Sequence, residues 1–412
     1  MVLAGVAGLG GCAARVPAAA IEPTPQGHPS VRERAYTIWL GGARVGTAHE
    51  EERWTARGVE LVRTETMKFL RGDTPVELVT TIAITADLAL VPSRVQWSER
   101  GGSALHEAVA VRAERGWRIT GDAPIHALAS GAIPAELVPL LVARDHGLVA
   151  PVFLPARGFV TGAGRIEPVA PGRFIARLVL AGGMHAEATI DTAADGTYVR
   201  IVDGEGVIAM AASPEEAAAP YPLTDLIAAT AIPISGAATG PITILGNLAL
   251  PAVPGQAART AEGGLELELS PRLPGALPDD APSRDRTAEI ALVMAQVRQQ
   301  ITPDLAAGPT SVADAAAATA GDCTTYALAY AAHARERLIP TRLVTGLRVD
   351  GDHLIRHRWA VSWTGTTWIA VDAAFGAAPA GGDLIGLAVT DADDAGLVAG
   401  EAALAQISGA RR

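Results

Sequence analysis

Short runs of alternating hydrophobic and polar residues dominate the first half of the chain. This alternation is typical of β-strands with one buried face, and it recurs at residues 36–40, 43–47, 58–69, 76–84, 90–97, 106–111, 117–120, 174–180, 185–190 and 197–202. Turn-forming pairs such as Gly41-Gly42 and Gly72-Asp73 separate the runs. The pattern predicts an antiparallel β-rich domain over residues 31–250, in which 158–210 could form a second subdomain. We expect the rings of four tryptophans on these strands to lie in the core: Trp39, Trp54, Trp97 and Trp117.

The pattern changes to a helical period in the second half of the chain. Ser283 can cap a helix that ends at Ile301. Five apolar residues fall on one stripe of this helix: Ile290, Val293, Met294, Val297 and Ile301. A second helix is predicted over 323–338, with Asp322 as its N-cap and Pro340 beyond its end. Two strand-like runs follow at 353–363 and 368–371.

These patterns divide the chain into five segments. Residues 1–30 are predicted to be a signal and a tether, and 31–250 the β-rich domain. Residues 251–284 are rich in Pro, Gly and Ala and contain one strand-like run, so we expect a linker. Residues 285–395 carry the two helices and the two strands and are predicted to be the catalytic domain. Residues 396–412 are predicted to be a tail with a closing helix at 399–407.

The candidate chemistry lies in the predicted catalytic domain. Cys323 falls in the first turn of a helix, where the free N–H groups and the helix dipole favour a negatively charged thiolate. A two-residue turn at Thr364-Gly365, or a symmetric four-residue loop, would place His357 directly opposite Asp372, with Cβ atoms about 4.5–5.5 Å apart. A carboxylate at that distance can orient the imidazole and leave its other nitrogen for the thiol. The spacing therefore predicts a catalytic Cys323, His357 and Asp372.

Two other interpretations of these residues remain open. Each residue alone is commonly structural, because a free cysteine often behaves as a small buried hydrophobe. A metal site of Asp352, His353 and His357 is the other alternative. However, two histidines four residues apart on a strand are about 13 Å apart, and no further ligands are evident. We therefore predict no metal and no cofactor.

Three separated motifs resemble the core of the transglutaminase-like superfamily. They are Gly-Asp-Cys at 321–323, His-Arg-Trp at 357–359 and a run from Trp368 through Val-Asp to Phe-Gly at 375–376. The resemblance covers residues 285–390, about a quarter of the chain. It implies an α+β protein in which the antiparallel β-rich region precedes a papain-like domain, with Cys323, His357 and Asp372 as the triad. Val361 stands where family members often carry an acidic residue, and Arg358 is larger than the usual neighbour of the histidine.

The composition limits the classes of partner. The net charge of −11 disfavours a surface that binds nucleic acid or an anionic membrane, since both partners are themselves negative. No stretch is long and apolar enough to predict a spanning helix. Leu9-Gly10-Gly11-Cys12 follows a short apolar run and resembles the lipobox of a bacterial lipoprotein. That resemblance implies a diacylated Cys12 and a protein anchored at the cell envelope. The alternative is an accidental apolar start, because no Lys or Arg precedes the run.

The residues and the resemblance together predict a cell-envelope enzyme that transfers acyl groups through a thiol. We expect it to hydrolyse peptide or amide bonds of a peptide or protein substrate through a thioester. The backbone N–H of Cys323 is the candidate oxyanion-hole donor. The alternatives are a protein-glutamine transamidase or deamidase, and a non-catalytic envelope scaffold that retains the fold.

Overall fold

The computed structural model describes residues 30–412, except 102–103, 124, 180–184, 195–196, 204–205, 238, 247–248, 279–283, 306–311 and 405. Two sequence predictions, lipidation at Cys12 and helix capping by Ser283, fall outside the described residues. No helix within the described ranges is long and apolar enough to cross a membrane.

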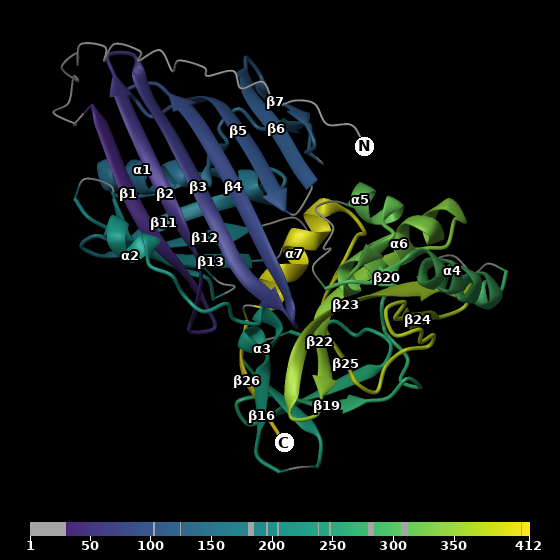
Figure 1. The fold of residues 1–412 in the computed structure, drawn as a ribbon. Helices are drawn as coiled ribbons and strands as arrows, with labels where there is room; N and C mark the ends of the chain where they lie inside the picture. The colour runs from purple at the N-terminus through teal and green to yellow at the C-terminus, as the bar shows by residue number, and fades with distance from the viewer. Residues whose placement is uncertain are drawn as a thin grey trace, which may run out of the picture.

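The first half of the chain forms one long, curled sheet (Figure 1). Consecutive strands pair antiparallel from β1 to β8 and from β10 to β15, β9 pairs parallel with β10, and β15 returns to pair with β1. The first series is β1 (Val31–Leu40), β2 (Ala43–Thr55), β3 (Gly58–Arg71), β4 (Thr74–Ala86), β5 (Pro92–Gly101), β6 (Ala104–Ala113), β7 (Gly116–Gly121) and β8 (Ala127–Leu128). The second is β9 (Ile133–Pro134), β10 (Leu148–Leu154), β11 (Val160–Ala170), β12 (Arg173–Val179), β13 (His185–Thr192), β14 (Tyr198–Asp203) and β15 (Ile208–Ala212).

One helix fills the interior of this curled sheet. The short turn η1 (Ala135–Leu137) leads into α1 (Val138–Asp145), and a second short turn, η2 (Pro155–Arg157), follows β10. Leu140 and Leu141 pack with side chains of β3 to β7, whereas Val138 and Val142 pack with those of β10 to β13. A helix that is apolar on both sides is expected where it is enclosed by two layers. Of the four tryptophans expected in the core, Trp54, Trp97 and Trp117 are buried there, whereas Trp39 is half-buried.

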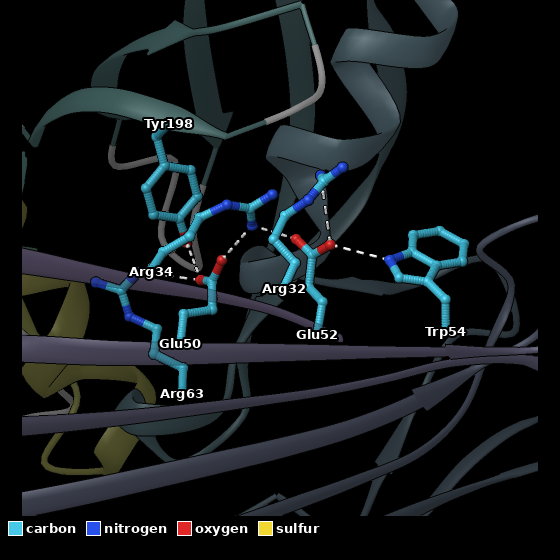
Figure 2. A network of polar contacts seen from close by, with 7 residues as sticks. All are labelled: Arg32, Arg34, Glu50, Glu52, Trp54, Arg63 and Tyr198. Atoms are coloured by element: carbon cyan, nitrogen blue, oxygen red, sulfur yellow. Dashed lines mark hydrogen bonds and ion pairs between the residues drawn. The ribbon is translucent and has the colours of Figure 1, made fainter. Parts of the chain in front are cut away.

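The inner face of the sheet also carries a buried network of charged residues, which Figure 2 shows. Glu52 is fully buried between Arg34 and Arg32, and the indole N–H of Trp54 donates to it at 3.0 Å. The network continues through Glu50, which pairs with Arg34, Arg63 and the hydroxyl of Tyr198. Buried charges are tolerated when they are paired and hydrogen-bonded, and these lie at alternate, inward-facing positions of β1, β2 and β3.

The second half of the chain forms a second sheet, in the order β18-β19-β17-β26-β16-β23-β22-β25, with β24 paired to β23. Its strands are β16 (Ile232–Ser235), β17 (Ile242–Gly246), β18 (Gln256–Ala261), β19 (Gly264–Leu269), β22 (Thr341–Asp350), β23 (His353–Trp363), β24 (Trp368–Val371), β25 (Leu384–Thr390) and β26 (Ile407–Arg411). β20 (Thr302–Pro303) and β21 (Ala320–Gly321) form a separate small parallel pair. The helices are α2 (Pro214–Ala218), α3 (Leu226–Thr230), α4 (Thr287–Gln300), α5 (Val312–Ala317), α6 (Cys323–Glu336) and α7 (Asp394–Leu404).

The expected α+β fold with a papain-like C-terminal domain is wrong. Strands make up 54% of the structure and helices 18%, so the protein as a whole is dominated by β-structure. The expectation failed because two segments whose sequences indicate a linker and a tail form strands of the second sheet. The segment 251–284 contributes the hairpin β18–β19 where one strand was expected, and 396–412 contributes β26 at the centre of the second sheet.

Two helices of the second half meet as the apolar stripe predicts. Ile290, Val293 and Val297 of α4 are buried against Tyr326 and Tyr330 of α6. Figure 1 shows α4 and α6 side by side at one end of the second sheet, and α7 between the two halves of the molecule. The packing of α4 therefore supports the helix that begins at Cys323.

Candidate active site

The candidate nucleophile lies at the first residue of α6. Asp322 is the N-cap, and its Oδ1 accepts hydrogen bonds from the backbone N–H groups of Thr324 at 2.9 Å and Thr325 at 3.2 Å, which confirms the predicted cap. Cys323 is half-buried and is a free thiol. Gly321 is required by close packing, because a Cβ there would lie 2.1 Å from the Thr325 hydroxyl. The cap and the glycine fix the direction in which α6 starts.

His357 and Asp372 meet in a buried contact. The two side chains come from β23 and from the residue just after β24. His357 Nε2 donates to Asp372 Oδ2 at 2.8 Å, and the two residues are 6% and 3% exposed. Since Nε2 is occupied by Asp372, Nδ1 is the ring nitrogen that remains for Cys323.

The predicted pairing of these residues across the hairpin is wrong by two positions. β23 and β24 pair Trp363 with Trp368 and Ala360 with Val371, so the register leaves Asp372 off the position opposite His357. The loop occupies residues 364–367, one residue later than a symmetric four-residue loop about Thr364-Gly365, and the Thr364 hydroxyl closes it by accepting from the N–H groups of Thr366 and Thr367. A shift of two residues keeps a side chain on the same face of a sheet, and a diagonal neighbour is within reach of long side chains.

Burial and two neighbouring side chains determine the charge of His357. Burial lowers its pKa, but hydrogen bonds with Asp372 and Cys323 and the negative charge of both raise it to about 10. The imidazole is therefore protonated at neutral pH and pairs with two acidic groups. The arrangement brings the three predicted residues together and places the thiol of Cys323 in hydrogen-bond contact with a protonated imidazole, the kind of neighbour that activates cysteine nucleophiles.

Two aromatic rings enclose the imidazole. Trp359 stacks on it with ring centroids 5.9 Å apart, and Phe375 meets it edge-on at 5.5 Å. Phe375 is 57% exposed, so one wall of the site is an apolar ring open to solvent. Arg348 lies over that ring, with its guanidinium carbon 3.4 Å from the centroid. These contacts restrict the imidazole to one plane.

The loop after Asp372 is anchored from α4. The guanidinium of Arg298 donates to the carbonyls of Ala373 and Ala374 at 3.1 and 2.9 Å. The backbone of Asp372 also exchanges two hydrogen bonds with Ala377, and the N–H of Phe375 donates to Asp372 Oδ1 at 3.3 Å. Asp372 is thus positioned by its own loop as well as by the strand that precedes it.

Arg358 has a structural role that the sequence did not assign. Its guanidinium donates to Thr345 on β22 at 3.1 Å, to Thr324 on α6 at 3.2 Å and to Glu401 on α7 at 2.6 Å. It is 6% exposed. Arg358 therefore ties the residue after Cys323 to two other elements. The sequence showed Arg358 only as an unusually large, charged neighbour of His357.

The residues of the alternative metal site are not gathered around one point. Exposed His353 hydrogen-bonds through Nδ1 to Asp352 at 2.7 Å, whereas His357 is buried against Asp372. Within the described ranges, no group of three or more His, Cys, Asp or Glu side chains is arranged to hold a metal ion.

Comparison with known proteins identifies one part of the chain. Residues 278–373 match the family model described as the Transglutaminase-like superfamily, and this segment contains Cys323, His357 and Asp372. That superfamily consists in general of cysteine-dependent enzymes. No curated protein matches the chain.

Two solved structures show weak similarity. A β-barrel-like protein of domain of unknown function DUF1849 from Brucella abortus is 8% identical, with 44% of this chain and 95% of that chain covered and a TM-score of 0.35. A DUF1089 family protein from Pseudomonas aeruginosa is 9% identical, with 37% of this chain and 87% of that chain covered and a TM-score of 0.27. Both scores are too low to indicate a shared fold.

Proposed function

Because residues 278–373 form a transglutaminase-like domain, we propose that the protein is a thiol acyl-transfer enzyme that hydrolyses peptide or amide bonds. Cys323 is the proposed nucleophile, His357 the acid and base, and Asp372 the residue that orients the imidazole. The observation that carries the proposal is the buried His357, which contacts Asp372 through Nε2 and is also hydrogen-bonded with Cys323.

The proposed reaction has two halves. The Cys323 thiolate attacks the carbonyl carbon of the amide, and the backbone N–H of Cys323 is our candidate donor to the resulting oxyanion. The imidazolium of His357 gives its proton to the leaving amine as the C–N bond breaks, which leaves a thioester on Cys323. Water then attacks the thioester, His357 takes up one of its protons, and the C–S bond breaks to re-form the thiolate and release the carboxylic acid, which ionises in solvent.

Trapping of the acyl-enzyme tests this proposal. Wild-type protein and the Cys323→Ala variant are incubated with a panel of peptide and glutamine-amide substrates, quenched in acid and weighed by mass spectrometry. We expect a mass increase on Cys323 in the wild type and none in the variant. Release of free acid would support hydrolysis, and transfer to an added amine would instead identify a transamidase.

Thiol reactivity supplies an independent test. An ion-paired Cys323 should react with iodoacetamide at pH 6 much faster than an ordinary cysteine, whose pKa is about 8.5. A slow reaction, together with no acyl-enzyme across the panel, would contradict the proposed function and favour a binding scaffold that retains the domain.

The proposed location is the cell envelope, with a lipid anchor at Cys12. The support is the sequence Leu9-Gly10-Gly11-Cys12. Labelling of a bacterial expression host with an alkyne fatty acid, followed by fractionation, tests it. We expect label and membrane association in the wild type and loss of both in Cys12→Ser. An unlabelled wild-type protein would contradict the anchor without affecting the proposed chemistry.

A further inference from the structure

The tip of the β3–β4 hairpin reaches from the first sheet to the start of α6. Figure 1 shows these two long strands extending out of the first sheet toward β23 and α7. At the tip, Arg71 Nη1 donates to the carbonyl of Leu305 at 2.8 Å and to Asp322 Oδ2 at 3.1 Å. A residue of the β-rich half therefore contacts the N-cap that directly precedes the candidate nucleophile.

The tip is held in place by a second, independent set of contacts. The N–H of Gly72 donates to Asp225 Oδ1 at 2.9 Å, and the N–H of Leu70 donates to the carbonyl of Thr224 at 2.9 Å. Asp225 is itself the N-cap of α3. The backbone on both sides of Arg71 is thus fixed by residues outside the site, so the position of its Cα does not depend on the ion pair with Asp322.

The two oxygens of Asp322 have different partners. Oδ1 accepts from the N–H groups that begin α6, and Oδ2 accepts from Arg71. The carboxylate belongs to the residue next to Cys323, so its negative charge opposes a thiolate there. The guanidinium of Arg71 offsets that charge while the cap remains in place.

We propose that Arg71 is a positioning residue for Cys323, and that the β3–β4 hairpin completes the active site by neutralising Asp322. This inference rests on the proposed function of Cys323 as nucleophile. It also gives the β-rich half a role in the chemistry, since this half of the chain supplies the positive charge that pairs with Asp322.

The other charged groups around Cys323 come from the second half of the chain. His357 is hydrogen-bonded with the thiol and is held by Asp372. Arg358 contacts Thr324 and is paired with Glu401 on α7. Asp304 also lies close, since its N–H donates to the Gly321 carbonyl at 3.0 Å. Substitution of Arg71 changes none of these residues, so the Asp322→Asn background described below can assign a change in the titration of Cys323 to the contact of Arg71 with Asp322.

The rate of iodoacetamide alkylation of Cys323, measured from pH 4 to 10, tests the proposal. Arg71→Gln removes the charge but keeps a donor for the Leu305 carbonyl, and Arg71→Lys keeps the charge. Lys68→Ala is the matched control, because it removes a cation of the same strand that pairs with Glu77 at 3.3 Å. All variants are first compared by urea unfolding, so that reactivity is measured on folded protein.

We expect the midpoint of the rate profile to move upward by about half a pH unit to one pH unit in Arg71→Gln. The shift is modest because Arg71 is partly exposed and acts on the thiolate through Asp322. Arg71→Lys should recover most of the shift, and Lys68→Ala should match the wild type. In an Asp322→Asn background, where the opposing charge is gone but a cap is retained, Arg71→Gln should have no further effect.

Two results would overturn the inference: an Arg71→Gln profile that coincides with the wild type, or a shift that persists unchanged in the Asp322→Asn background. Either result can be distinguished from failure of the proposed function, because that function is tested by acyl-enzyme trapping and thiol alkylation of the wild-type protein. The Arg71 shift is measured relative to the wild-type midpoint, wherever that midpoint lies on the pH scale.

Discussion

His357 Nε2 lies 2.8 Å from Asp372 Oδ2, although the two residues are not partners in the β23–β24 ladder. Asp372 follows the last paired residue of β24, and its backbone pairs with Ala377 in the loop that Arg298 anchors. The position of the carboxylate therefore depends on loop contacts as well as on the hairpin. The side chain of Asp372 can therefore be substituted without loss of a hydrogen bond between β23 and β24.

Asp372→Asn should change the orientation and the protonation of His357 without unfolding the protein. The amide is the same size as the carboxylate, but it removes the negative charge that helps to keep His357 protonated. We expect amide turnover to fall by about 10²- to 10⁴-fold and Cys323 alkylation at pH 6 to slow. The measurements are the steady-state rate of turnover of the substrate found by trapping and the rate of Cys323 alkylation.

The matched control for that substitution is Asp352→Asn. Asp352 is an exposed carboxylate beside a histidine in the same sheet, so both rates should be unchanged. If Asp372→Asn unfolds the domain while activity per folded molecule stays at the wild-type level, the orienting role of Asp372 is incorrect.

The raised pKa of His357 predicts a specific dependence of stability on pH. Its folded-state pKa of about 10 lies above the ordinary value of 6.5. The folded state therefore binds the proton more tightly than the unfolded chain does. The resulting stabilisation is complete below about pH 6.5 and is lost as the pH rises from there to about 10. Urea unfolding of the wild type and of His357→Gln across this interval measures it. The free energy of unfolding should fall more in the wild type; parallel curves would contradict the raised pKa.

Local signals in the sequence predicted the start of α6 well. Capping by Asp322 and the stripe on α4 depend on residues close in sequence, and both agree with the structure. The β23–β24 register was missed by two residues because the four-residue loop 364–367, closed by the hydroxyl of Thr364, is centred one residue later than predicted. That error kept Asp372 on the same face as His357, since side chains alternate with a period of two.

Features that depend on long-range pairing could not be predicted from the sequence. β26 inserts between β16 and β17, which precede it by more than 150 residues, and nothing in its five residues indicates that position. The contact of Arg71 with Asp322 joins residues 251 positions apart. The α+β expectation followed from the family resemblance, and it failed because the predicted linker and tail contribute β18, β19 and β26 to the second sheet.

Arg358→Ala should loosen the start of α6. The substitution leaves Glu401, Thr345 and Thr324 without the guanidinium that joins them, and unmade polar contacts of this kind cost about 1–3 kcal/mol. We expect lower stability in urea and slower alkylation of Cys323 in the protein that remains folded. Arg358→Lys should recover little, because a lysine cannot reach three acceptors in fixed directions.

Arg356→Ala is the control for this prediction. Arg356 also lies near Glu401, at 4.0 Å, but is more exposed than Arg358. Its loss should change the free energy of unfolding by less than about 1 kcal/mol. Equal effects of the two substitutions would show that α7 is held by general charge attraction and not by the three directed hydrogen bonds of Arg358.

Glu52→Gln tests whether the buried network of Figure 2 stabilises the first sheet independently of the candidate site. Glu52 is fully buried and pairs with Arg34 and Arg32, so its neutralisation leaves buried guanidinium charge without its counter-charge. Removal of one partner from such a pair costs about 3–5 kcal/mol, and the urea midpoint should fall accordingly.

Glu51→Gln, one residue earlier on the exposed face, should cost less than about 1 kcal/mol. Alkylation of Cys323 in the folded fraction should be unchanged in both variants. If Glu52→Gln were as stable as Glu51→Gln, the arginines would have to be neutralised by other groups, such as Glu50, and the network would not depend on this carboxylate.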